Sequence, residues 1–102
     1  MQHPDAVDAR LEFTWKDHSR YVDIASVQTG WLVVWGKYED AGARKLVAGS
    51  RVYRDPEGAR RRLVTAIVEL TANPGSAQDA LVLLDREGGL QRRDLLGLPD
   101  PL

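Results

Sequence analysis

The feature of this sequence that most constrains its fold is a change of hydrophobic period at Asp55. Before this residue, apolar side chains alternate with polar ones or form short β-rich runs, as in strands. After it, apolar residues recur three or four positions apart, as on one face of a helix. Asp55, Pro56 and Glu57 favour a helix start, as an N-cap acid, a proline at the first helical position and a first-turn acid. The chain therefore divides into a strand half and a helix half.

The first half predicts four strands separated by short polar turns, at residues 11–15, 21–27, 31–35 and 45–53. Alternation in the first strand makes Leu11, Phe13 and Trp15 one set of apolar positions. The third strand is apolar throughout, so both of its faces need cover and it should be central. Gly49 indicates a bulge or a close approach in the fourth strand. The side chains of that strand divide into two sides: Leu46, Ala48 and Val52 on one, and Val47 and Tyr53 on the other.

The second half predicts one long and one short helix. The core-facing stripe of the long helix consists of Ala59, Leu63, Ala66, Ile67 and Leu70. Asn73-Pro74-Gly75 should end this helix, and Ser76 with Asp79 resembles a capping box for the second one, which Gly88-Gly89 stops. Strands followed by helices predict an α+β fold, a four-stranded antiparallel meander sheet with both helices packed on one face.

The length and composition fit one globular domain. The chain has 102 residues, of which 43% are hydrophobic and 28% charged, so a single domain is expected over 1–102 with tails at 1–9 and 90–102. No cysteine is present, which excludes disulfides and thiolate metal sites. Residues 1–10 have no apolar run like that of a signal peptide, and no stretch approaches the roughly 20 apolar residues of a membrane helix. We expect a cytoplasmic protein with no membrane partner.

The sequence offers no catalytic constellation. His3 and His18 lack a second ligand at helical spacing, so no metal site is predicted. Ser50 lacks the glycine pattern of a nucleophile elbow, and no phosphate-binding glycine loop is present. We therefore expect neither enzyme activity nor a cofactor.

Positive charge is concentrated in the middle of the chain. Residues 43–62 carry seven basic and two acidic groups, whereas the net charge of the whole chain is −1. Arginine favours bidentate contacts with phosphate or carboxylate, and a helix N-terminus lies beside this segment. A solvated helix face is the alternative. The candidate residues for an anionic partner are Lys37, Arg51, Arg54, Arg60, Arg61 and Arg62.

The sequence contains more apolar side chains than one contact between a sheet and a helix needs. They are candidates for a homodimer or partner interface: Leu32, Val34, Val64, Val68, Val82 and Leu83. Alternatively, the two helices cover each other's second stripes, and a strand end, the C-terminal segment or a second subunit covers the strand residues. Leu95, Leu96 and Leu98 form either a docking peptide, a strap over the sheet or a disordered tail.

The third strand carries two tryptophans on one face, Trp31 and Trp35, separated by Val33. Such a pair either stacks nucleic-acid bases or forms the core beneath the first helix. The core interpretation is favoured, because a domain of this size needs bulky side chains in its interior.

A short motif at the end of this strand has a counterpart in a known family. It comprises a Trp-Gly-cation sequence, a glycine in the next turn, and an acid and an alanine at the helix start: Trp35, Gly36, Lys37, Gly42, Glu57 and Ala59. With these, residues 31–70 resemble the WGR domain, a small sheet–helix module found beside nucleic-acid enzymes. The resemblance implies nucleic-acid or partner contact through Trp35 and Lys37. The sequence departs from the family in having lysine for arginine and an acidic turn at Glu39 and Asp40.

The sequence as a whole favours a small non-catalytic interaction module that self-associates or binds a protein. The alternative is a nucleic-acid-binding domain that uses the arginine-rich segment.

Overall fold

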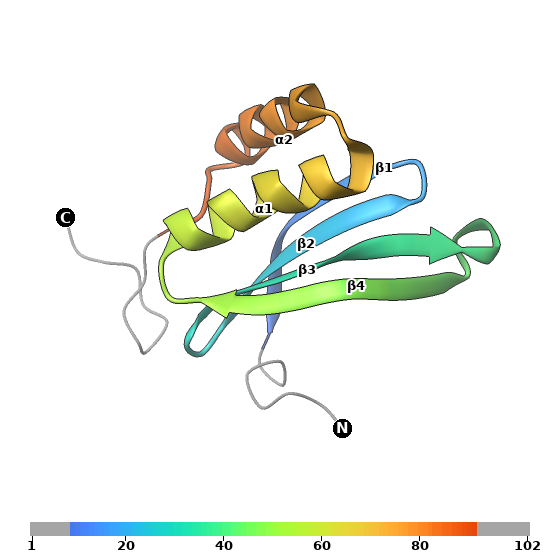
Figure 1. Cartoon of the computed structure of the whole chain (residues 1–102). Coiled ribbons are helices and arrows are strands. Elements are labelled where there is room, and N and C mark those ends of the chain that lie inside the picture. The colour runs from blue at the N-terminus through green and yellow to red at the C-terminus, as the bar shows by residue number, and fades with distance from the viewer. Residues whose placement is uncertain (1–8, 92–102) are drawn as a thin grey trace.

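The computed structural model describes residues 9–91 and confirms the α+β fold (Figure 1). Four strands form an antiparallel sheet in the order of the sequence, and two helices lie on one side of it. The strands are β1 (Arg10–Asp17), β2 (Arg20–Val27), β3 (Gly30–Glu39) and β4 (Arg44–Tyr53). The helices are α1 (Pro56–Thr71) and α2 (Pro74–Arg86), and a short 3-10 turn, η2 (Asp40–Gly42), joins β3 to β4. Within residues 9–91, no helix is long and apolar enough to cross a membrane.

The core lies between the sheet and the helices. Trp31 and Val33 of β3 are almost completely buried, as are Leu63 and Ile67 of α1. The other buried members of this core are Phe13, Trp15, Val22, Ile24, Ala59, Ala66, Ala77, Ala80 and Leu84. Trp35 is partly buried against the same cluster. The tryptophan-bearing face of β3 is therefore core, and Trp31 is unavailable for stacking on bases.

The start of α2 differs from the predicted one. The helix begins at Pro74, and the side chain of Asn73 accepts a hydrogen bond of 2.9 Å from the backbone N–H of Gly75. Asn73 and Pro74 thus provide the N-cap and first helical position before the chain reaches Ser76, so the predicted capping box is wrong. The first helix ends at Thr71, followed by Ala72 in the left-handed conformation with φ of 56°.

Two register shifts turn side chains toward faces that simple alternation does not predict. One lies between Leu11 and Phe13, so Leu11 is opposite Ala25 and leaves the face of Phe13. The other makes Trp35 pair with Gly49 but Gly36 with Val47, which leaves Ala48 as the extra residue. The predicted bulge near Gly49 is thus confirmed. Because a one-residue shift exchanges faces, the predicted grouping of Leu46 with Val52 is wrong.

Gly36 sits at the second shift, where the backbones of β3 and β4 approach closely. A Cβ at this position would lie 2.0 Å from the carbonyl oxygen of Leu46. We expect Gly36→Ala to lower the free energy of unfolding by about 1–3 kcal/mol, because the strands must separate locally. Urea unfolding would measure the effect, with Ser50→Ala on the exposed part of β4 as control. An unchanged midpoint for Gly36→Ala would show that the bulge relaxes without cost.

Candidate functional site

One face of the sheet is left without cover by the described residues (Figure 1). The strand register places Leu11, Ala25, Leu32 and Val52 opposite one another in a row that crosses all four strands. The neighbouring Val34 and Val47 lie on the same face. Leu11 and Val47 are about three-fifths exposed, at 61% and 60%. We define Leu11, Leu32, Val34, Val47 and Val52 as the open-face patch.

The open-face patch includes a shallow hollow. Leu32, Val34, Val47 and Val52 line a depression of about 390 Å³ together with Ser50 and Arg51. Antiparallel sheets with one solvated face normally present polar side chains there. The outward residues of β3 and β4 are mostly aliphatic in this region, so the surface is poorly suited to permanent contact with water.

The opposite end of the same face is polar and filled by its own side chains. Tyr21 is fully buried there, with the ring of Tyr38 at a centroid distance of 5.1 Å. Lys45 lies 4.4 Å from the centre of the Tyr21 ring, and its Nζ is 2.6 Å from the Oδ2 of Asp23. The Nζ of Lys16 lies 4.7 Å from the centre of the Tyr38 ring. We call these five residues the tyrosine cluster.

The surroundings in the tyrosine cluster raise the pKa values of Tyr21 and Lys45. Burial raises the pKa of Tyr21, Lys45 opposes this shift, and Asp23 and Tyr38 add to it. Burial alone would lower the pKa of Lys45, but the hydrogen bond and charge of Asp23, helped by Tyr38 and Tyr21, raise it overall. Near neutral pH the phenol of Tyr21 is therefore neutral and Lys45 is protonated.

Tyr21→Phe tests the cost of the buried phenol, whose hydroxyl has no hydrogen-bond partner among the described residues. At neutral pH we expect the free energy of unfolding to stay the same or rise by up to about 1 kcal/mol. The pKa of Tyr21 is higher in the folded chain than in the unfolded chain. The contribution of Tyr21 to stability is therefore complete below the unfolded pKa, near 10, and is lost as the pH rises through the folded pKa. The variant should consequently lose stability less steeply above about pH 10. Chemical unfolding at several pH values measures this, and identical slopes for both proteins would contradict it.

Two of the six predicted anion-binding residues make ion pairs within the fold. Arg60 makes a bidentate ion pair with Asp85 of α2, with one Nη2–Oδ2 distance of 3.0 Å. Arg62 lies 3.9 Å from the ring centre of Trp35 and donates to the Glu69 carboxylate at 2.9 Å. Both arginines are thus engaged within the fold.

The other four predicted cations have no carboxylate partner in the described part of the chain: Lys37, Arg51, Arg54 and Arg61. Arg51 packs 5.5 Å from the ring centre of Tyr53, and Lys37 stands at the far end of β3. Among residues 9–91, four of the six predicted cations are therefore left without an ion pair.

The six predicted interface residues fall in three places. Leu32 and Val34 belong to the open-face patch. Val64 and Val68 of α1 are partly buried against the core. On α2, Val82 is 56% and Leu83 is 41% exposed. Leu95, Leu96 and Leu98 lie outside the described residues.

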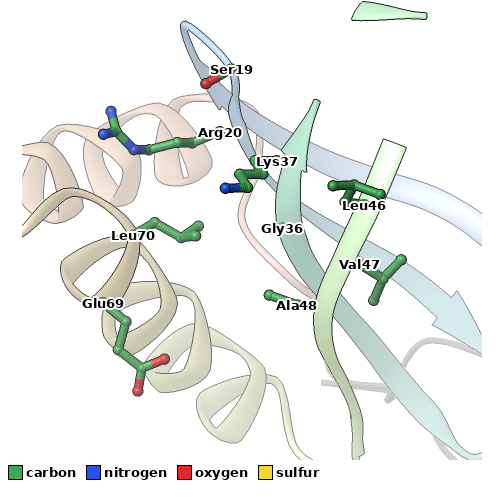
Figure 2. A pocket seen from close by; sticks show the side chains of 9 residues that line it. All are labelled: Ser19, Arg20, Gly36, Lys37, Leu46, Val47, Ala48, Glu69 and Leu70. Atoms are coloured by element: carbon green, nitrogen blue, oxygen red, sulfur yellow. The ribbon is translucent and has the colours of Figure 1, made fainter. Parts of the chain in front are cut away.

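A second concave region lies on the helix side of the sheet, which we call the sheet-end pocket (Figure 2). It has a volume of about 530 Å³. Lys37 is the predicted residue that it contains, and Arg20, which sequence reasoning missed, stands beside it as the Cα partner across β2 and β3. The remaining lining residues are Ser19, Gly36, Leu46, Val47, Ala48, Glu69 and Leu70.

Comparisons with family models, curated proteins and solved structures find no match to this chain. The WGR-like resemblance therefore stays a prediction. Its Trp35 lies against Gly49 and Arg62, and its Lys37 opens on the sheet-end pocket. Among residues 9–91, no three His, Asp or Glu side chains gather in a way that could hold a metal ion.

Proposed function

We propose that this chain is a non-catalytic interaction module that self-associates through the open face of its sheet. The observation that supports this most is the apolar row of Leu11, Ala25, Leu32 and Val52 across all four strands. Contiguous exposed apolar surface of this kind marks interaction sites in small domains. A chain without cysteine suits a reducing compartment, and the cytoplasm is the proposed location.

A second copy of the chain fits this surface in size and charge. Four strands about 4.8 Å apart and eight residues long give a whole face of roughly 500 Å², which includes the tyrosine cluster as well as the open-face patch. Two such faces bury about 1,000 Å², which is near the lower limit for a specific interface. The five residues of the open-face patch are uncharged, and the charged side chains of the same face belong to the neighbouring tyrosine cluster, where Lys45 and Asp23 form an ion pair.

The surface on α2 is the weaker candidate for self-association. Val82 and Leu83 are exposed side by side, but the other apolar residues of the two helices, Val64, Val68 and Leu81, are already packed against the core. The helices thus cover most of their own second stripes, which leaves a smaller apolar surface there than on the sheet.

A dilution series of ¹H–¹⁵N correlation spectra tests the proposed surface. As the dimer dissociates, we expect the amide signals of Leu11, Leu32, Val34 and Val52 to move together. The amides of Val82 and Leu83 should stay in place. Concentration-dependent shifts on α2 instead would assign self-association to the helices, and spectra that never change at any concentration would speak against a reversible dimer.

Nucleic-acid binding stays the alternative function and has less support. Arg60 and Arg62 are paired within the fold, so a nucleic acid would depend on Lys37, Arg51, Arg54 and Arg61. Fluorescence anisotropy with labelled single-stranded and duplex oligonucleotides distinguishes the two functions. Binding that falls steeply with salt and disappears in Arg61→Glu would make the nucleic-acid function primary. An absence of binding at low salt, where electrostatic attraction is strongest, would remove it.

A further inference from the structure

The sheet-end pocket is built from elements that meet only in the folded chain. Its floor comes from the start of β2, the end of β3 and the start of β4, and one wall comes from the last turns of α1 (Figure 2). A volume of about 530 Å³ is within the range of small-molecule sites. Leu46, Ala48 and Leu70 supply apolar contact surface. The pocket is therefore large enough for a small organic ligand.

Two like charges stand side by side in this pocket. Arg20 and Lys37 are direct partners in the antiparallel pairing of β2 and β3, and their register places them on the same face as Val22 and Trp35. In Figure 2 the side chain of Lys37 points toward Leu70, whereas the guanidinium of Arg20 stands apart from the Lys37 ammonium. Like charges directly opposite each other destabilise a sheet. The pair therefore costs electrostatic free energy, part of which Asp17, the Cα partner of Arg20 on β1, offsets.

No carboxylate in residues 9–91 pairs with Arg20 or Lys37. The pocket has one acidic lining residue, Glu69, and Arg62 already holds its Oε2 at 2.9 Å. Asp17, in the neighbouring hairpin, lies 3.5 Å from His18. Arg20 and Lys37 thus line an open cavity without an ion pair to residues 9–91, although Asp17 is the Cα partner of Arg20 across β1 and β2, and an anionic ligand would supply the contacts that the two cations lack.

We propose that the sheet-end pocket binds a phosphate monoester with a small apolar substituent. Two adjacent cations match the charge of a phosphate dianion, and the arginine fork can bond two of its oxygens while the lysine acts as a point charge. The apolar substituent would pack against Leu46 and Leu70. The two sites have Val47 in common but differ in their charged groups, because Arg20 and Lys37 lie on the helix side of the sheet, away from the rest of the open-face patch.

The probe is phenyl phosphate, titrated into the ¹⁵N-labelled full chain and followed by ¹H–¹⁵N correlation spectra. We expect saturable shifts in the amides of residues 19–20, 36–37, 46–48 and 69–70. Phenol, which has the ring without the charge, should cause none of them. Benzoate, a monoanion of similar shape, should bind about tenfold more weakly or worse, because it can satisfy only one of the two cations.

Charge-neutral variants test the two cations separately. Arg20→Gln and Lys37→Gln should each weaken phenyl phosphate binding by about tenfold or more, which corresponds to one charge-assisted contact. Arg10→Gln is the matched control, since Arg10 is an exposed arginine at the start of β1 and pairs with Ser26 at the other end of the sheet. It should leave binding unchanged. Well-dispersed spectra establish that each variant is folded.

Three outcomes would overturn this site. The first is an absence of saturable shifts with phenyl phosphate at millimolar concentration. The second is equal weakening by Arg10→Gln and Arg20→Gln, which would indicate general surface attraction. The third is benzoate binding as tight as that of phenyl phosphate, which would contradict selection of a dianion.

Discussion

Val34→Lys is expected to convert a dimer of this chain into a monomer. Val34 lies in the open-face patch, opposite Ser50 of β4 and Asp23 of β2. A lysine there would be buried at the interface beside Asp23, whose carboxylate already accepts hydrogen bonds from Thr14 and Lys45, and taking such a charge out of water costs several kcal/mol per ion. Two-fold symmetry introduces the change twice. The dimer dissociation constant should therefore rise more than about 100-fold.

The matched control is Val82→Lys, which makes the same substitution at an exposed valine of α2. Sedimentation velocity at several concentrations gives the association constant of each variant. We expect Val82→Lys to associate like the wild type, while Val34→Lys sediments as a monomer. The opposite pattern would place the interface on the helices. Thermal unfolding of both variants would show whether either one has simply lost its fold.

Trp31→Ala is expected to cause the largest loss of stability of any single change considered. Trp31 is 1% exposed and lies in the core between the sheet and α1, with Ser26 and Tyr53 as its cross-strand neighbours. Truncating a buried tryptophan removes apolar contact area and leaves a cavity, which together cost about 3–5 kcal/mol. This is a large part of the 5–15 kcal/mol that stabilises a typical domain.

Chemical unfolding followed by circular dichroism measures that loss. Leu83→Ala is a suitable control, because Leu83 is 41% exposed on α2 and surface substitutions of this kind usually change stability by less than about 0.5 kcal/mol. A Trp31→Ala protein as stable as Leu83→Ala would contradict a core beneath α1. It would also reopen the interpretation of this strand face as a base-stacking surface.

The order of strands and helices could be predicted because each segment has a distinct hydrophobic period. The apolar run around Val33 and the helical stripe of Leu63 and Ile67 each point to a buried face, and all three side chains are fully buried. The helix start at Pro56 likewise follows from its local residues. The buried faces and the helix start depend on residues that are close together in the chain, so local sequence patterns are enough to predict them.

The composition of the open face could not be predicted in the same way. Leu11 and Val47 reach that face through register shifts, and a single extra residue exchanges the two sides of a strand without changing its composition. Simple alternation therefore grouped Leu11 with Phe13 and Trp15. Leu32 and Val34 were recognised because they belong to a strand that is apolar on both faces.

Pairings between distant residues decide which arginines are available. Arg60 and Asp85 are 25 positions apart and meet only because α2 folds back beside α1. Arg20 joins Lys37 through the register of β2 and β3, a relation that no local pattern contains. Charge counting along the chain found the basic segment but could not separate the engaged cations from the unpaired ones.

The most direct test of self-association through the open face is the mass of the wild-type protein by sedimentation equilibrium at near-neutral pH. A single chain has a mass of 11.4 kDa. We predict that at high concentration the mass approaches twice this value, and that it falls toward the single-chain mass on dilution. A mass that stays at 11.4 kDa up to the highest attainable concentration would contradict a dimer built on the open-face patch.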